Sequence, residues 1–522
     1  MRIATLLAVA GLGLPHSSPA ARPRLVVVIT VDQLRPDYLE RFRPQLIGGL
    51  GLLLRGGAVF TDAFQDHAVT ETAPGHSTIL SGRVPAHTGI IRNLAGVQDS
   101  SAPLLGVRGP GASPARFRGT AFFDWLHAAQ PAARALSVSR KDRAAILQLG
   151  RAKQQVYWYQ AGSFTTSRYY ADSLPGWVRA FNAQRVPFKL AGAIWTPLLP
   201  AADYPEPDSE PYEHAGHDFT FPHRLPMDSA QAADTLIDVP TMDSLTLAFA
   251  LAGVRALGLG GRGATDLLAV SLSTTDAVGH LYGPESREIH DQVVRLDRYL
   301  GWFLGQLFVR YGAGGVTIVL TADHGVTPYP EWARAHGHPE ARRVSLDSVL
   351  RDVNRELDER AGGADWLVFD TGMLLAPDRA KLAAAGVNAD SVIAAVAARV
   401  RAVPGVARVQ SFAELARADT LGDPVTRRWR HQVPEGAGVE LVVTLKPYSV
   451  WSHGAPIAEH GQPTDFDAHV PLIFWGKGFQ REEYGGRVRT VDIAPTLARL
   501  LDLTPGEPLD GRPLADALAP RN

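Results

Sequence analysis

Three acidic residues of this 522-residue chain stand just behind short apolar runs that have the composition of buried strands. Asp32, Asp276 and Asp323 each lie within four residues of the end of such a run. Open α/β sheets bind ligands at the carboxyl ends of their strands, so these carboxylates would meet there. They would repel one another unless a cation lay between them. One such Asp is usually a turn residue, whereas three, two of them followed closely by a histidine, indicate a metal site.

The histidines near two of these carboxylates indicate which metal. Asp276 and His280 are spaced i, i+4 and would share one face of a helix. Asp323 and His324 are adjacent and could serve one ion if the backbone bends sharply at Gly325. Imidazole nitrogen mixed with carboxylate oxygen suits zinc better than magnesium or calcium. Each pair alone is weak evidence, but together they supply about five ligands, too many for one tetrahedral zinc and enough for two.

A candidate nucleophile, Thr72, lies in the segment TETAPGH at residues 70–76. Pro74 fits the first turn of a helix, where its missing N–H has no cost. Thr72 would then stand at the helix N-terminus, where exposed N–H groups and the helix dipole favour a phosphate. A threonine at such a position is more commonly an ordinary N-cap. The spacing alone leaves both roles open.

The elements that would position these residues follow from the hydrophobic pattern. Continuous apolar runs predict strands covered on both faces, as in a parallel sheet. An apolar stripe from Ile289 to Leu307, with steps of three and four residues, predicts a helix that ends near Gly312. We therefore expect an α/β fold with a largely parallel central sheet flanked by helices, and with inserted segments at about 100–235 and 335–450. The predicted strands are Leu25 to Val31, Leu267 to Leu272, Val316 to Leu320 and Val470 to Trp475.

Composition excludes several classes of protein. The chain has 52 Lys and Arg against 53 Asp and Glu, and 45% of its residues are hydrophobic. Gly and Pro number 50 and 38, too few to make disorder the default. A pI near 7.0 argues against a dedicated nucleic-acid binder. The absence of cysteine excludes disulfide scaffolds, cysteine-ligated zinc ribbons, iron–sulfur sites and thiol nucleophiles.

The first 20 residues have the pattern of a signal peptide. Arg2 supplies a positive start, the stretch from Ile3 to Leu14 is apolar, and Ser18-Pro19-Ala20 ends in a small residue. The apolar stretch is too short to span a membrane, which takes about 20 residues. We expect cleavage to leave residues 21–522 as a catalytic domain that is periplasmic or secreted and no longer bound to the membrane.

Six segments resemble those of a known family. The chain is similar to the alkaline phosphatase superfamily, and to its branch with a threonine nucleophile, which contains nucleotide pyrophosphatase/phosphodiesterases and threonine-type alkaline phosphatases. The resemblance runs from Asp32 to Gly476, nearly the whole mature chain, and implies an alkaline phosphatase-like fold. In chain order the segments are VDQLRPDYL, TETAPGHSTILSG, GIIRN, STTDAVGH, TADHG and EHGQPTDFDAHVPLIFWG.

The resemblance implies a ligand set for two zinc ions. His453 competes with His460 for the last position, and His460 is preferred because PTDFDAHVP, shortly after it, matches the family. The implied ligands are Asp276, His280 and His460 for one ion, and Asp32, Asp323 and His324, completed by Thr72 Oγ, for the other. The family gives no ligand role to His336, His338 or His469.

A basic tripeptide decides the subtype within the branch. Lys141-Asp142-Arg143 would ordinarily be a solvated charge run. With AAILQLG and VYWYQAGSFTTSRYY after it, it resembles the threonine-type alkaline phosphatases that cleave phosphomonoesters. The resemblance implies that Lys141 and Arg143 contact phosphate oxygens and that Asn93, in GIIRN, donates to another. Two cationic side chains favour the more highly charged monoester over a diester.

The sequence thus predicts a secreted, zinc-dependent phosphate monoester hydrolase that acts through a phosphothreonine at Thr72. Its expected partners are small phosphate monoesters, and no oligomeric state is predicted. A phosphodiesterase or nucleotide pyrophosphatase with the same two-zinc site is the nearest alternative. A non-catalytic metal- or phosphate-binding protein is less favoured, because nucleophile and ligands are all present. A sulfatase is also less favoured, because no cysteine is available for conversion to formylglycine.

Overall fold

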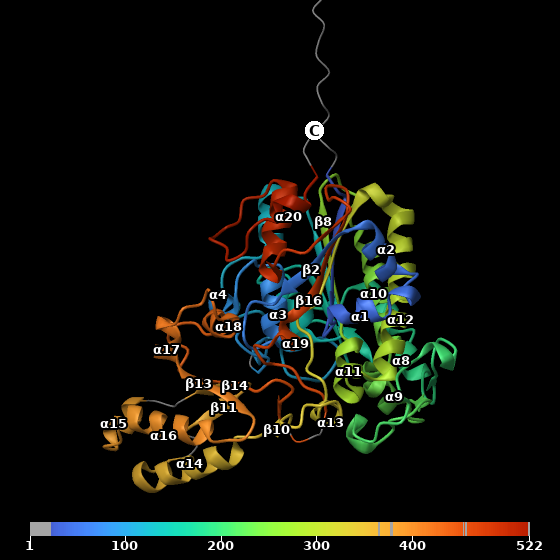
Figure 1. The fold of residues 1–522 in the computed structure, drawn as a ribbon. Helices are drawn as coiled ribbons and strands as arrows, with labels where there is room; N and C mark the ends of the chain where they lie inside the picture. Colours follow the sequence, from blue (N-terminus) through green and yellow to red (C-terminus); the bar gives the residue numbers. More distant parts are fainter. Residues whose placement is uncertain are drawn as a thin grey trace, which may run out of the picture.

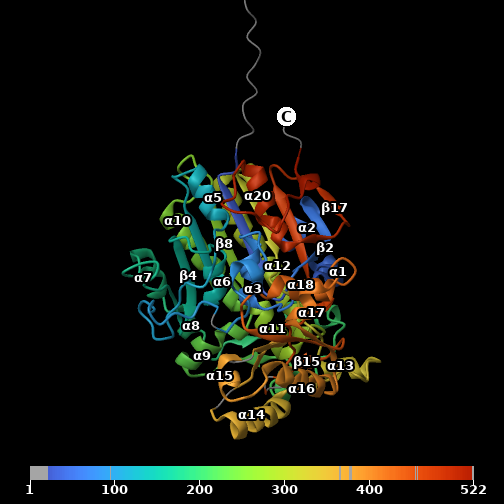
Figure 2. The same ribbon diagram turned by 90° about the vertical axis from the view of Figure 1, so that its left-hand side faces the viewer.

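A ten-stranded sheet forms the centre of the protein (Figures 1 and 2). The computed structural model describes residues 22–94, 96–363, 366–375, 379–452, 454 and 457–519. All strands of this sheet run in one direction except β16 and β5, which confirms the predicted α/β fold. From one edge, the order is β17 (Glu482–Tyr484), β2 (Ala58–Phe64), β16 (His469–Gly476), β9 (Val316–Thr321), β1 (Leu25–Val31), β8 (Asp266–Leu272), β3 (Ala135–Ser139), β4 (Gln155–Gln160) and β5 (Ser163–Thr165), and β18 (Val488–Arg489) also pairs with β2.

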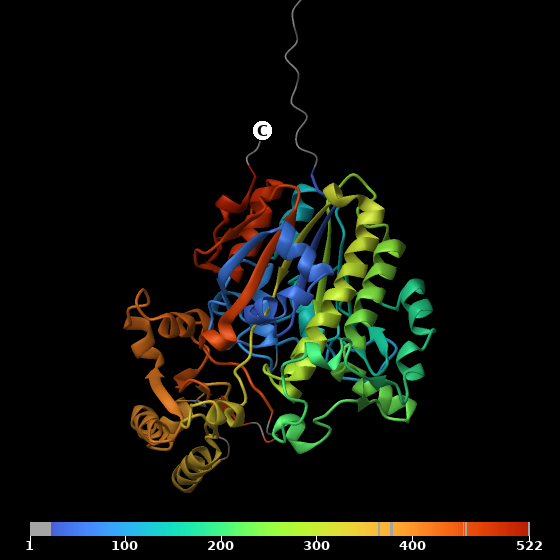
Figure 3. The ribbon, with the colours of Figure 1, turned by 45° about the vertical axis from the view of Figure 1, so that its right-hand side comes forward.

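Helices cover both faces of the sheet, because alternate residues of a strand point to opposite sides. In β1, Val27 and Ile29 belong to one buried apolar cluster, and Val26 and Val28 belong to another. The first cluster lies under α1 (Pro36–Arg41), α2 (Gly49–Gly56), α10 (Thr241–Leu257) and α12 (Arg287–Tyr311). The second lies under α3 (Thr72–Ile79), α5 (Phe122–Ala129), α6 (Asp142–Leu147) and α20 (Ile493–Leu501). Figure 3 shows α12 and α10 side by side on the first face.

The predicted elements are largely where the hydrophobic pattern indicated. β1 has the predicted bounds, and α12 ends at Tyr311, with Gly312 as its C-cap. β16 is an exception, because it runs antiparallel to both of its neighbours instead of joining the parallel set. A continuous apolar run reports burial on both faces, which a strand in either direction can have.

Part of the segment expected as an insertion at about 100–235 belongs to the core. It contributes β3, β4 and β5 to the central sheet. Serines in β3 and glutamines and aromatics in β4 break the aliphatic run by which the other strands are recognised. Within the described part of the chain, no single helix is long and apolar enough to cross a membrane, and only Ser229–Asp238 and Thr241–Leu257 taken together, at an angle of 92°, pass that criterion.

Residues between about 343 and 451 form a small second domain. Its two ends pair with each other, since β10 (Arg343–Val344) lies parallel to β15 (Val450–Trp451). We refer to this two-strand ladder as the neck. The domain has its own antiparallel sheet and its own buried apolar cluster. The strands are β11 (Val368–Asp370), β12 (Met373–Leu375), β14 (Val439–Leu445) and β13 (Val406–Ser411), and the larger helices are α14 (Asp347–Ala361), α16 (Ala389–Arg401) and α18 (Pro424–Gln432).

Four neighbouring parallel strands, β9, β1, β8 and β3, precede the candidate residues that the sequence analysis singled out at strand ends. Their carboxyl ends meet at one edge, so the residues that follow them are brought together. Helix α3 lies against this edge so closely that a Cβ atom at Gly75 would be 2.3 Å from the carbonyl oxygen of Asp323. The absence of a side chain at Gly75 therefore sets the position of α3.

We predict that Gly75→Ala moves α3 away from β9. Because the obstructing atom is a backbone oxygen, we expect the free energy of unfolding to fall by about 1–3 kcal/mol, together with the turnover of any substrate that this edge binds. Gly305→Ala in α12 is the matched control, since no atom lies within 4 Å of its Cβ position. This control should be as stable as the parent or more stable by up to about 1 kcal/mol. Denaturant unfolding that gives both variants the same stability would contradict the close approach.

Candidate active site

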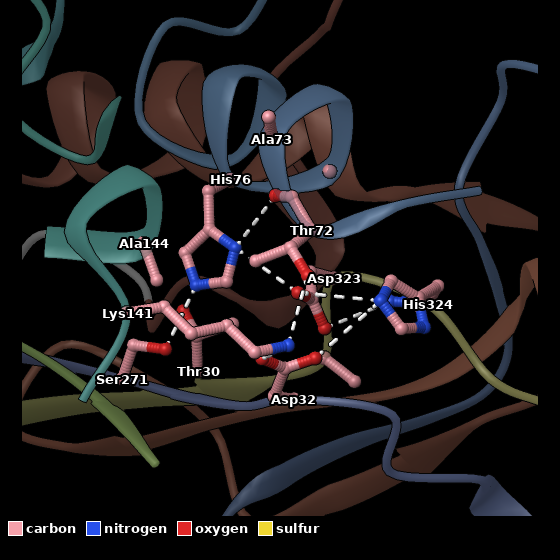
Figure 4. Close-up of polar contacts among 12 residues, drawn as sticks. Thr30, Asp32, Thr72, Ala73, His76, Lys141, Ala144, Ser271, Asp323 and His324 are labelled. Carbon is pink, nitrogen blue, oxygen red and sulfur yellow. Dashed lines mark hydrogen bonds and ion pairs between the residues drawn. The ribbon is translucent and has the colours of Figure 1, made fainter. Parts of the chain in front are cut away.

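The candidate residues that follow the strands gather at the carboxyl edge of the four parallel strands, and Figure 4 shows Asp32, Asp323 and His324 there beside Thr72. Asp32 follows β1, Asp323 and His324 follow β9, and Lys141 follows β3. Asp276 lies in the first turn of α11 (Thr274–Tyr282), which follows β8, and His280 is one turn later on the same helix, as its spacing predicted. Asp32, Asp323 and His324 are fully buried, and Asp276 is 4% exposed.

Two groups of ligand atoms lie close enough together to hold metal ions. Asp276, His280 and His460 form one group, and Asp32, Asp276 and His324 form the other, with the ligand atoms of each group within 4.8 Å of one another. The second group differs from the implied set by including Asp276. Asp323 is nevertheless adjacent, with Oδ2 3.6 Å from His324 Nε2. Asp276 therefore lies between the two positions.

These groups fit two zinc ions on the chemistry of their donors. Asp32 Oδ1 and His324 Nε2 are buried 3.4 Å apart, yet neither has a hydrogen-bond partner among the described residues. Buried polar atoms without partners are costly and call for an explanation. A cation between them would satisfy both, and the mixture of imidazole and carboxylate is typical of zinc.

Thr72 is the first residue of α3, and Glu71 is the N-cap. Thr72 therefore lies inside the helix, one residue after the N-cap, and does not have the ordinary N-cap role. Its Oγ1 accepts a hydrogen bond of 3.0 Å from Lys141 Nζ. The same ammonium lies 2.7 Å from a carboxylate oxygen of Asp32 and 2.7 Å from one of Asp276. Lys141 thus connects the hydroxyl to the two acidic groups.

Asn93 is hydrogen-bonded to the residue after Thr72, whereas Arg143 pairs with its neighbour Asp142. Asn93 Oδ1 accepts the backbone N–H of Ala73 at 2.8 Å, which leaves the Nδ2 hydrogens as the donors that can reach a ligand. The Arg143 side chain has one ion pair among the described residues, a 3.8 Å approach to Asp142, and its buried Nε has no partner. Arg143 therefore lies at the start of α6 without a hydrogen bond or ion pair to Thr72, Asp32, Asp276 or Asp323.

Burial and neighbouring charges shift the pKa values of several groups at this edge. Burial, together with the nearby Asp276 and Asp323, raises the pKa of Asp32. Burial also opposes ionisation of Asp276, but Lys141 and His280 outweigh it and hold that pKa well below its usual range. Burial lowers the pKa of His324 well below its usual range, so this imidazole is neutral, the form that binds a metal. The three carboxylates together thus favour added positive charge.

Two further residues hold the ligands in place and were not singled out from the sequence. Gln33 donates its backbone N–H to Asp323 Oδ1 and its Nε2 to Asp276 Oδ1, both at 3.2 Å, and has a positive φ of 66°. His76 Nδ1 lies 3.0 Å from Asp323 Oδ2, and its Nε2 lies 2.9 Å from Ser271 Oγ (Figure 4). Their places in the sequence could have indicated both residues, because Gln33 directly follows Asp32 and His76 lies in the same motif as Thr72.

The remaining histidines are elsewhere. His336 stacks on Trp332, and His338 stacks on Tyr448. His469 stacks on Phe64. None of the three belongs to the two ligand groups. His453, the alternative to His460, lies outside the described residues, whereas His460 Nε2 is 3.2 Å from His280 Nε2.

Comparison with known proteins identifies the family of the chain. The type I phosphodiesterase/nucleotide pyrophosphatase family matches residues 26–408. Alkaline phosphatase PhoK from Sphingomonas is 33% identical over 95% of this chain and 92% of its own. Alkaline phosphatase PafA from Elizabethkingia meningoseptica is 29% identical over 98% of both chains. A crystal structure of wild-type PafA superposes with a TM-score of 0.88 at 28% identity, covering 97% of this chain and 100% of PafA. The chain therefore belongs to the type I phosphodiesterase/nucleotide pyrophosphatase family, within the alkaline phosphatase superfamily that its motifs indicated.

Proposed function

We propose that the chain is a phosphoric monoester hydrolase that transfers a phosphoryl group first to Thr72 and then to water. One observation carries the proposal. Thr72 is the first residue of helix α3 and lies beside two groups of side chains that could bind metal, with its hydroxyl 3.0 Å from the Lys141 ammonium. The alkaline phosphatases PhoK and PafA, similar over nearly the whole chain, support the monoester as substrate class.

The metal would be two zinc ions, and six side chains fit them in donor type and burial. When bound, zinc supplies the positive charge that lowers the pKa of a hydroxyl or water and stabilises a leaving oxygen. The side chains that would hold the ions are Asp276, His280 and His460 on one side and Asp32, Asp323 and His324 on the other.

The chain's own residues would supply the nucleophile and the groups that bind the phosphoryl oxygens. In the first step, Thr72 Oγ forms a bond to phosphorus while the bond to the ester oxygen breaks and the alcohol leaves. In the second, water cleaves the phosphothreonine and releases inorganic phosphate. The Lys141 ammonium would neutralise charge on the phosphoryl oxygens, and the Nδ2 of Asn93 and the N-terminus of α3 would hydrogen-bond them. The contacts of Lys141 with Thr72 and of Asn93 with Ala73 support these roles.

A phosphodiesterase or nucleotide pyrophosphatase is the second candidate, because the matching family carries that description. Charge favours the monoester. Its dianion has more negative oxygen to neutralise than a diester has. Lys141 Nζ lies 3.0 Å from Thr72 Oγ1, and Arg143, whose buried Nε has no hydrogen-bond partner among the described residues, lies on α6, which contacts α3.

We also propose that the enzyme is exported, on the strength of Arg2, the apolar stretch that follows and Ser18-Pro19-Ala20. Protein recovered from native cells should begin near residue 21. Recovery with Met1 intact would contradict cleavage.

Thr72→Ala should lose most turnover of a phosphomonoester while keeping the fold and about two zinc ions per chain, because only the attacking oxygen is removed. Thr72→Ser should retain part of the activity. Wild-type enzyme stopped during turnover should carry phosphate on Thr72 by peptide mass spectrometry. Wild-type turnover in Thr72→Ala would refute the nucleophile.

The same metal analysis separates ligands from other histidines. His460→Ala should lose zinc and activity together, whereas His336→Ala, which alters an exposed histidine stacked on Trp332, should lose neither. Zinc well below two per chain in fully active wild-type enzyme would count against the two-ion site.

Lys141→Ala and Arg143→Ala should distinguish the two candidate functions. Loss of one preorganised donor typically lowers the rate by about 10²–10³-fold. A diester has one charge fewer, so its hydrolysis should suffer less, and the preference for monoester over diester should narrow. Rates on a monoester and a diester with the same leaving group measure this, with the exposed Lys153→Ala as control. Equal losses on both substrates would make the two residues structural, and no loss on either would favour the phosphodiesterase.

A further inference from the structure

A tight turn of the small domain reaches the carboxyl edge of the large sheet, where the candidate active site lies. Thr371 and Gly372 join β11 to β12 and have φ values of 40° and 80°. Two-residue hairpin loops with both φ values positive are usually Asn-Gly or Asp-Gly. A β-branched residue in this region is a strained outlier, and such outliers persist only where their surroundings hold them. Thr371 is also 4% exposed, which is unusual for the tip of a hairpin.

The Thr371 hydroxyl is held by the N-cap of the nucleophile's helix. Its Oγ1 donates to Glu71 Oε1 at 2.7 Å. The other carboxylate oxygen of Glu71 accepts the backbone N–H of Asn93 at 2.6 Å. Asn93 Oδ1 in turn accepts the N–H of Ala73, the residue after Thr72. One carboxylate thus connects the turn to both the nucleophile and the asparagine.

A second contact joins the turn to the segment that contains Asn93. Arg92 Nη1 donates to Asp370 Oδ2 at 2.7 Å, with both side chains about one-fifth exposed. The turn also lies against a metal-binding segment, because a Cβ atom at Gly461 would be 2.7 Å from Thr371 Cγ2. Gly461 directly follows His460, and its N–H donates to Thr70 Oγ1 at 3.2 Å. Thr371 is therefore enclosed between the Glu71–Asn93 contact and the segment that contains His460.

An apolar cluster and two hydrogen bonds also attach the small domain to the segments that carry Thr72 and Asn93. Met373 and Val442 pack in one buried cluster with Ala68 and Val69, which precede the nucleophile. Gln432 of α18 accepts the N–H of Val69 at 2.9 Å and donates to the carbonyl of Ile91 at 2.6 Å. The two segments that carry Thr72 and Asn93 are thus both fastened to the small domain.

We propose that Thr371 and Glu71 form a positioning pair, supplied jointly by the small domain and the catalytic domain, that fixes Asn93 for phosphoryl transfer. Neither residue needs to touch the substrate. Glu71 holds the Asn93 backbone while Ala73 holds its Oδ1, so Nδ2 is directed to a phosphoryl oxygen, and the Thr371 hydroxyl keeps Glu71 in that position. This inference rests on the proposed function, in which Asn93 binds the phosphoryl group.

The test is Thr371→Val, which removes the hydroxyl and keeps the shape, beside Thr371→Ser, which keeps the hydroxyl. A hydrogen bond to a charged group is involved, so we expect Thr371→Val to lower kcat/KM for a phosphomonoester about tenfold. We expect Ki for inorganic phosphate to rise by a similar factor, because Asn93 would hold the product as well. Thr371→Ser should lie within about twofold of wild type. A mere loss of folded enzyme would lower kcat and leave KM and Ki unchanged.

Thr444→Val is the matched control in the same small domain. Its hydroxyl is also buried and accepts a hydrogen bond, from Trp429 Nε1 at 2.9 Å, but it does not contact Glu71. It should lower stability without changing kcat/KM or Ki. In an Asn93→Ala background, Thr371→Val should have less than about a twofold effect, since coupled residues are not additive.

Two results would overturn the pair. One is a Thr371→Val variant with wild-type kcat/KM and Ki, and the other is an equal tenfold loss with and without Asn93. The proposed function fails separately, through a wild-type enzyme with no monoester turnover or a fully active Thr72→Ala.

Discussion

Three carboxylates buried side by side are the constraint on which the rest of this site depends. Asp32, Asp276 and Asp323 follow neighbouring parallel strands and are almost inaccessible to solvent. Buried like charges are costly unless compensated by opposite charge and hydrogen bonds. The surroundings supply both: an ammonium between two of the carboxylates, the imidazoles of His76, His280, His324 and His460, and the amide groups of Gln33. A centre of this kind binds cations and, through them, anionic substrates.

The sequence was informative wherever a pattern depended on neighbours in the chain. Continuous apolar runs located β1 and β9, and the stripe of α12 gave its end at Gly312. The spacing of Asp276 and His280 placed both on α11. The ordered motifs indicated the superfamily, which the comparisons confirm. In each case the information lay within about one element, or in order along the chain, and needed no knowledge of packing.

Features that depend on packing were not accessible in the same way. The direction of β16 is set by its neighbours and not by its apolarity. β3 and β4 have too mixed a composition to be recognised as central strands. The grouping of Asp276 with Asp32 and His324 arises from the meeting of strand ends. The contact of Glu71 with Thr371 joins residues 300 positions apart, and no sequence pattern near either residue predicts it.

The neck of the small domain has a consequence for how such an enzyme can diversify. Since β10 and β15 lie side by side, the chain leaves the catalytic domain and returns to it at one place. Lengthening, shortening or exchanging the intervening segment would leave the path of the metal-binding strands untouched. Selection could therefore remodel the surroundings of the substrate as a cassette while the reaction chemistry stays constant. This freedom ends where the small domain contacts the segments of the site, at the Thr371–Gly372 turn and at Gln432, because a replacement segment would have to reproduce those contacts.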